Sequence, residues 1–192
     1  RSGISHEFLL YFNVRDLVDN YRYIDRFLYD EFIKQRNFSI VAFYDISRGL
    51  TFLDREMERE FNMITSNEAA NLFRSLPSKL FPYIDIALRN TKMVLFINHT
   101  EKILPSVDVG SMSLEERSAL IWISEWSVNP KISSVGSTIF MLADNLADVS
   151  REILKSSYRV EPILVELPGE EERRKYIEYL LQDGSVKSDI TI

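Results

Sequence analysis

The sequence predicts one α/β domain, a three-layer sandwich of about five mostly parallel strands with helices on both faces. Short apolar runs alternate along the chain with segments of helical periodicity, which is the order typical of parallel strands joined by helices. The chain has 192 residues, which suits one domain. Hydrophobic residues make up 45% of the chain, enough to build a packed core.

The predicted strands are short runs in which apolar residues follow one another without alternation. Such continuity is typical of strands buried on both faces of a sheet. The run Met93–Ile97 is the clearest of them. The predicted strands cover residues 8–14, 38–44, 93–97, 137–143 and 162–167.

Helices are predicted between these strands from apolar spacing and from capping residues. Ser113 and Glu116 fit a capping box, in which each side chain satisfies a free backbone N–H of the first turn. Asp144 or Asn145 is placed to cap a later helix. Pro77 and Pro82 are expected to break up the chain around them, and residues 45–49 are expected to form a turn. The predicted helices cover residues 21–33, 54–63, 68–73, 83–89, 113–126, 146–155 and 169–182.

Composition excludes several classes of protein. With 29 acidic and 23 basic residues, the net charge is -6, which argues against binding to nucleic acid. The absence of cysteine excludes disulfides, thiol catalysis and cysteine-based zinc sites. The two histidines, His6 and His99, are far apart, so we expect no metal site. No apolar run approaches the roughly 20 residues of a membrane span, and we expect a cytoplasmic protein.

Four pieces of the second half of the chain follow one another in an order and spacing known from one family. Residues 93–105 (MVLFINHTEKILP) look like a Walker B strand and its continuation. Residues 138–145 (TIFMLADN) look like a sensor-1 strand with a polar residue at its tip, and residues 146–154 look like the helix after it. Residues 165–177 (VELPGEEERRKYI) look like the last core strand and the first lid helix. Together these pieces resemble the core of AAA+ ATPases, a family with the P-loop NTPase fold.

The resemblance implies a domain organisation. Residues 1–167 are expected to form the AAA+-like α/β core, in which residues 8–44 supply the first two strands on topology alone. Residues 168–192 are expected to begin a helical lid or linker. A second, active AAA+ domain is expected to follow in the full protein.

The sequence departs from the family where nucleotide chemistry takes place. A P-loop needs G-x-x-x-x-G-K-[ST], yet none of the six glycines stands in that context, and Arg15–Val18 follow the first predicted strand. At the Walker B position, Asn98 and His99 replace Asp-Glu. Asparagine offers no anionic oxygen to magnesium, and a histidine base would have no metal or phosphate to act on. The sequence therefore predicts a degenerate core, a pseudo-ATPase without catalytic residues.

Asn98, His99 and Asn145 are the candidate remnants of the nucleotide site. Each also has a plainer interpretation, because polar residues commonly end strands and Asn145 suits a helix cap. We favour the plainer interpretation for all three. No cofactor is expected to bind, although ATP and magnesium belong to the parent family.

Three further pairs of residues have two interpretations. Arg151 and Arg159 lie where AAA+ proteins often carry an arginine finger, although surface arginines are more common. Arg15 and Asp16 are hypothesised to form an ion pair in the vacated phosphate pocket. Trp122 and Trp126 lie four residues apart on one helix and are expected to pack in the core.

The resemblance implies a non-catalytic module with an assembly or regulatory role in a larger ATP-driven, chaperone-like or remodelling protein. Its expected partners are other AAA+ subunits or a following AAA+ domain, in a homo-oligomeric ring. Two alternatives stay open. One is a ligand-binding or enzymatic doubly wound domain with a site at the strand ends around Asp45, Asn98 and Asp144. The other is a weak nucleotide binder without hydrolysis.

Overall fold

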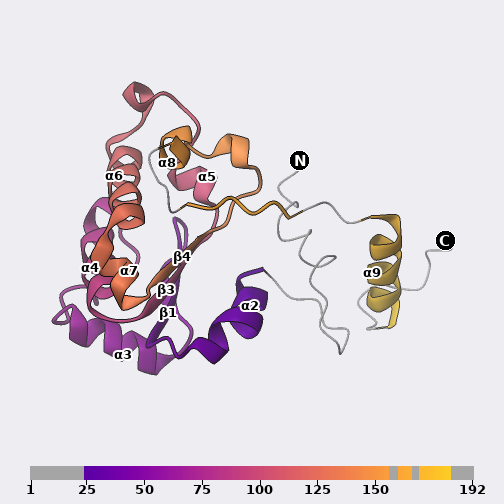
Figure 1. The fold of residues 1–192 in the computed structure, drawn as a ribbon, viewed down its shortest axis with the longest axis horizontal. Coiled ribbons are helices and arrows are strands. Elements are labelled where there is room, and N and C mark those ends of the chain that lie inside the picture. The colour runs from indigo at the N-terminus through magenta and orange to yellow at the C-terminus, as the bar shows by residue number, and fades with distance from the viewer. Residues whose placement is uncertain (1–23, 156–159, 166–168, 183–192) are drawn as a thin grey trace. The chain divides into compact units, whose positions relative to one another are not determined.

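The structure is a computed structural model that describes residues 24–155, 160–165 and 169–182. It contains two compact units, of which residues 33–162 form the one with the sheet. The described residues 24–32, 163–165 and 169–182 belong to the other unit. These residues hold helix α2 (Ile24–Leu28), most of a π-helical turn (Tyr29–Ile33) and helix α9 (Glu170–Gln182) (Figure 1).

The sheet has four strands in the order β2-β1-β3-β4. The central strands β1 (Ile40–Asp45) and β3 (Met93–Ile97) pair in parallel, and β4 (Thr138–Met141) adds in parallel to β3. The edge strand β2 (Gly49–Phe52) runs antiparallel to β1. This mostly parallel sheet with surrounding helices confirms the predicted fold class.

Three predicted strands are confirmed, with small shifts of their ends, as β1, β3 and β4. The turn predicted at residues 45–49 is present, but the strand β2 that follows it was missed. Residues 162–165 form no strand, contrary to prediction, although they belong to an apolar run. Ile163 is 83% exposed, which shows why hydrophobicity alone misled, since a buried strand needs a neighbouring strand and a covering layer. The strand predicted at residues 8–14 lies outside the described residues.

Three predicted helices of the sheet-bearing unit need correction, and the short helices at Thr100–Ile103 and Pro130–Val135 were not predicted. Residues 68–73 form turns and not a helix. The helix predicted at residues 146–155 is split into a 3-10 turn (Leu146–Asp148) and helix α8. The third correction concerns α4 and is described below. The remaining helices are α3 (Arg55–Ile64), α4 (Pro77–Asn90), α5 (Thr100–Ile103), α6 (Leu114–Val128), α7 (Pro130–Val135) and α8 (Arg151–Lys155), with 3-10 turns at Lys34–Arg36 and Val109–Ser111.

Helix α4 begins at Pro77 and continues through Pro82, although both prolines were expected to break up the chain around them. Pro77 occupies its first turn, where a missing N–H leaves no bond unmade. Pro82 lies inside the helix and removes one backbone hydrogen bond. The buried side chains around it, including Phe81 and Ile84, are 0% exposed. The tertiary packing of these buried side chains therefore outweighs the backbone hydrogen bond that Pro82 removes.

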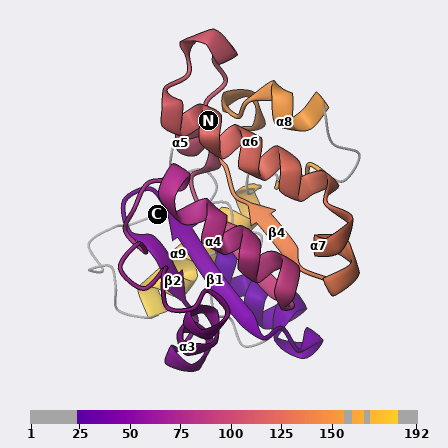
Figure 2. The ribbon, with the colours of Figure 1, turned by 90° about the vertical axis from the view of Figure 1, so that its left-hand side faces the viewer.

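Helices α4, α6 and α7 lie over one face of the sheet (Figures 1 and 2). That face is built from alternate residues of the central strands, such as Tyr44 and Leu95, which join the hydrophobic core with residues of α4 and α6. The intervening residues point to the opposite face, where Phe43, Phe96 and Phe140 stack across three strands with ring centroids 5.1 Å apart.

Polar contacts join α6 to α4 at both ends. Ser113 and Glu116 form the predicted capping box at the start of α6. The carboxylate of the adjacent Glu115 accepts hydrogen bonds from the backbone N (3.0 Å) and the Oγ (2.6 Å) of Ser78 in the first turn of α4. At the other end, Trp126 Nε1 donates to Asp85 Oδ1 at 3.2 Å, and Asp85 is also paired with Arg89. Trp126 is buried in the core, as predicted for this pair of tryptophans.

None of the described helices is both long and apolar enough to cross a membrane.

Candidate functional site at the carboxyl edge of the sheet

The carboxyl ends of β1, β3 and β4 lie at one edge of the sheet. Tyr44 pairs with Ile97, and Ile97 pairs with Met141, so the three strands end level with one another. Backbone hydrogen bonds join the segments beyond them: Asn98 N donates to Tyr44 O (2.8 Å), and Thr100 N donates to Leu142 O (2.9 Å). In open α/β sheets, ligands usually bind at this edge. The structure therefore places the loop after β3 between those after β1 and β4.

The carboxylate of Asp45, the last residue of β1, bonds to the turn that follows it. Its carboxylate accepts hydrogen bonds from the backbone N–H groups of Ser47 (2.8 Å) and Arg48 (2.7 Å). It also accepts from Ser47 Oγ (2.6 Å) and Arg48 Nε (2.8 Å). A carboxylate has about four acceptor positions; three of these contacts end on Oδ1 and one ends on Oδ2. Asp45 holds the turn into β2 and has little left to offer a ligand.

Two opposing effects set the pKa of Asp45. Burial raises it, because a carboxylate loses hydration inside the protein. The hydrogen bonds from Ser47 and Arg48 and the Arg48 charge lower it, and their sum outweighs burial. The net pKa lies below the ordinary value of 3.8, so Asp45 is ionised at neutral pH. The neighbouring Tyr44 has its pKa raised by burial and then by the charges of Glu115 and Asp45, so it keeps its proton.

Asn98 and His99 follow β3, where the sequence placed the degenerate Walker B pair. Asn98 is half-buried, and His99 has an exposed side chain. The backbone of His99 is left-handed, with φ 53° and ψ 48°, a conformation that few residues other than glycine adopt readily. This turn starts the short helix α5 without a side-chain cap. His99 therefore redirects the chain at the end of the strand.

Glu101 is a residue that sequence reasoning missed. It is 6% exposed, and neither carboxylate oxygen has a hydrogen-bond partner among the described residues. His99 Nδ1 and Lys102 Nζ each lie 3.9 Å from its Oε1, beyond hydrogen-bond range. A buried carboxylate without hydrogen bonds is costly. Its only sequence signal was an acidic residue shortly after the strand, because burial depends on the tertiary packing of α5.

Asn145 caps the 3-10 turn after β4. Its Oδ1 accepts a hydrogen bond from the backbone N–H of Ala147 at 3.2 Å. This contact fits the plainer interpretation of Asn145. A role of Asn98, His99 or Asn145 as a remnant of a nucleotide site stays a prediction, as does the domain boundary at residue 167.

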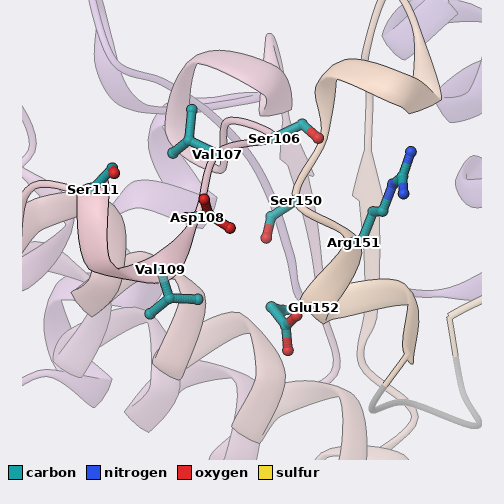
Figure 3. Close-up of a pocket in the computed structure, with 8 residues that line it drawn as sticks. All are labelled: Ser106, Val107, Asp108, Val109, Ser111, Ser150, Arg151 and Glu152. Carbon is teal, nitrogen blue, oxygen red and sulfur yellow. The ribbon is translucent and has the colours of Figure 1, made fainter.

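An open hollow of about 660 Å³ lies between the loop after α5 and the start of α8 (Figure 3). None of the strand-end residues lines it. Asp108 and Glu152 bring negative charge to it, while the side chain of Arg151 points away from both in Figure 3. Negative charge disfavours a phosphate group. The residues that line it are Ser106, Val107, Asp108, Val109, Ser111, Ser150, Arg151 and Glu152.

The other sequence-predicted residues are Arg151, which begins helix α8, and three residues outside the part of the chain that the structure describes. Arg151 is exposed on the first turn of α8, which is compatible with either interpretation of it. Arg159, Arg15 and Asp16 lie outside the described residues. Among the described residues, no group of three or more His, Cys, Asp or Glu side chains is arranged to hold a metal ion.

Comparison with known families gives one match. The sequence model of the family described as AAA+ chaperone, N-terminal Rossmann-like domain matches residues 1–166. It covers most of the chain, and it confirms the predicted relation to AAA+ proteins and a Rossmann-like fold. No curated protein matches the chain.

Proposed function

Because the chain belongs to the family of AAA+ chaperone N-terminal Rossmann-like domains, we propose that it is a non-catalytic module of a larger AAA+ chaperone. In this proposal the domain hydrolyses no ATP itself and acts in the assembly or regulation of the chaperone. Its partners are other AAA+ subunits or a following AAA+ domain, in a homo-oligomeric ring in the cytoplasm.

The observation that carries the proposal is the pair Asn98–His99 at the end of β3. Magnesium is held in nucleotide sites by hard, preferably anionic oxygens, and a neutral amide is a poor substitute. The imidazole of His99 is a softer ligand that suits other metals. The end of the central strand thus lacks the pair of acidic side chains that magnesium-dependent hydrolysis uses.

The other polar residues of the edge support the same proposal. Asp45 is occupied by Ser47 and Arg48. Asn145 is occupied by its own helical turn. A hydrolytic site would instead keep such groups free to approach phosphate, water or metal. The polar side chains of this edge therefore serve to hold the loops that follow the strands.

One observation favours a second candidate function, a ligand site at the strand ends. The buried carboxylate of Glu101 lacks hydrogen-bond partners among the described residues, and its contacts with His99 and with the ammonium of Lys102 are long, at 3.9 Å each. A positively charged group brought by a ligand or partner would relieve this cost. The candidate differs from a nucleotide site, because a carboxylate repels phosphate.

Phosphate release from Mg-ATP by the purified chain tests the proposal. We expect no release above that of a double variant, Asn98→Ala with His99→Ala, purified in the same way. The matched variant separates the activity of this edge from that of a contaminating ATPase. Hydrolysis by the unmodified chain that disappears in the double variant would overturn the proposal.

A further inference from the structure

Helix α6 is apolar on two opposite faces. Its inner face packs Ala119, Ile123 and Trp126 into the core. Its outer face exposes Leu114 (74%), Ile121 (59%) and Val128 (51%). These three residues are spaced by seven, which places them along one line of a helix that is slightly under-wound by a neighbour. A helix apolar on both sides is suited to a second packing partner.

The outer face is also symmetric about Ile121. Leu114 and Val128 lie seven residues before and after it, and both are apolar. Arg117 and Glu125 lie four residues before and after it, and they carry opposite charges. Both charged side chains are exposed, and neither has an ion pair among the described residues. Two small residues, Ser118 and Ser124, lie three before and after the same centre and leave room for a close approach.

This symmetry identifies the partner. If two copies of α6 lie antiparallel with Ile121 at the centre, Leu114 of each copy meets Val128 of the other. Arg117 of each copy then meets Glu125 of the other, so two ion pairs form. A parallel pair would instead place like charges opposite each other, which is unfavourable. Self-complementarity across a twofold axis is what a symmetric dimer requires.

We propose that the outer face of α6 binds the same face of a second copy of this chain, antiparallel and in register at Ile121. The spacing of seven residues favours a shallow left-handed crossing of about 20°. The interface is isologous, and it can therefore join two subunits but cannot by itself extend into a ring. The proposal depends on α6 alone and not on the absence of ATP hydrolysis.

The expected dimer is weak. Helix α6 has 15 residues, which corresponds to about 22 Å of helix. A single helix pair of this length buries less area than the roughly 1,200 Å² typical of a stable interface. We expect a dissociation constant on the order of 10–100 µM and a dimer that weakens as salt screens the two exposed ion pairs.

Analytical ultracentrifugation of the 192-residue chain, from about 1 to about 300 µM protein, tests the proposal. The unmodified chain should pass from monomer to dimer. Ile121→Lys puts two like charges at the twofold axis and should abolish the dimer over this range. Because Ile121 is exposed, the variant should keep its circular dichroism spectrum and its melting temperature. Met63→Lys is a matched control, because it adds the same charge at a residue that is 70% exposed on a different helix, α3. This variant should leave the dimer unchanged.

A charge exchange tests the antiparallel register. Arg117→Glu alone and Glu125→Arg alone each place like charges opposite each other and should weaken the dimer by about tenfold. The double variant exchanges both members of each pair and should restore dimerisation to within about threefold of the unmodified chain. A monomer at all concentrations would overturn the proposal, as would a dimer that survives Ile121→Lys. Failure of the double variant to restore the dimer would overturn the proposed pairing.

Discussion

The carboxyl edge of the sheet and the outer face of α6 use their side chains in opposite ways. At the edge, Asp45 and Asn145 bond to backbone groups only two or three residues away. On the outer face of α6, Arg117 and Glu125 have no ion pair among the described residues, and Ile121 is exposed. A side chain that bonds to its own chain contributes to folding. A side chain without such a bond is available to another molecule. Substitutions at the edge should therefore change stability, and substitutions on the outer face of α6 should change dimerisation.

The largest expected effect is at the edge, in the turn between β1 and β2. Gly49 has φ +79°, and a Cβ added there would lie 2.0 Å from the carbonyl oxygen of Phe73. We expect Gly49→Ala to lower the free energy of unfolding by about 4 kcal/mol or more, because backbone must move and the conformation is strained. Urea denaturation measures this. Gly110→Ala is the matched control, since nothing lies within 4 Å of its added Cβ, and it should change stability by less than about 0.5 kcal/mol.

A smaller effect is expected for Asp45→Asn. The amide keeps one acceptor oxygen but loses the charge and the second acceptor that hold Ser47 and Arg48, so we expect a loss of about 1–3 kcal/mol at neutral pH. The pKa of Asp45 is lowered by folding. Its contribution to stability is therefore present above the unfolded pKa, about 3.9, and is lost as pH falls through the lower folded pKa.

The pH dependence separates this mechanism from a simple packing defect. Between neutral pH and about pH 2, the unmodified chain should lose the Asp45 contribution. Asp45→Asn should lose correspondingly less stability over the same range. Urea denaturation at several pH values provides the comparison. Equal acid sensitivity of the two proteins would show that the charge of Asp45 does not stabilise the turn.

The cap after β4 should contribute less. Asn145→Ala removes the hydrogen bond to Ala147 N, and we expect a loss of about 0.5–1 kcal/mol. Asn129→Ala is a matched control, because Asn129 caps α7 through an equivalent bond of 2.9 Å to Lys131 N. Similar losses in thermal melts would support a capping role for both. No loss with Asn145→Ala, against a clear loss with Asn129→Ala, would contradict the cap.

The smallest effect is expected at His99, where a gain is predicted. Its backbone is left-handed and its side chain is 45% exposed, so His99→Gly should leave stability unchanged or raise it by up to about 1 kcal/mol. His99→Ala keeps the unfavourable backbone and should show no gain. A clear loss with His99→Gly in thermal melts would mean that the imidazole makes a stabilising contact, with Glu101 the first residue to examine.

The parts of the fold that could be predicted are those in which one local signal agrees with the tertiary structure. The apolar runs of β1 and β3 predicted buried strands, and the residues of both strands are indeed largely buried. Ser113 and Glu116 form a capping box, which depends on local geometry alone. Other features needed the tertiary structure. Helix α4 tolerates Pro82 because the side chains around this proline are buried. Strand β2 has only four residues, and it forms because it pairs with β1.

The structure shows where the candidate residues lie, while their role as a site stays a prediction. Asn98 and His99 directly follow β3, while Asn145 caps the 3-10 turn that comes after β4. The burial of Glu101 without a hydrogen bond among the described residues could not be predicted, because it depends on how α5 packs. The outer face of α6 was hidden for a different reason. A helix that is apolar on both faces gives no clear periodicity in sequence, so only the exposure of Ile121 reveals the second face.

Isothermal titration calorimetry of this chain with Mg-ATP and with Mg-ADP tests the central claim most directly, because it measures binding whether or not hydrolysis follows. Protein and nucleotide concentrations should detect a dissociation constant of about 100 µM or tighter. We predict no binding heat with either nucleotide, since β3 is followed by Asn98 and His99 and not by two acidic residues. Magnesium-dependent binding that is lost in Asn98→Ala would contradict the account, because this edge would then hold a nucleotide.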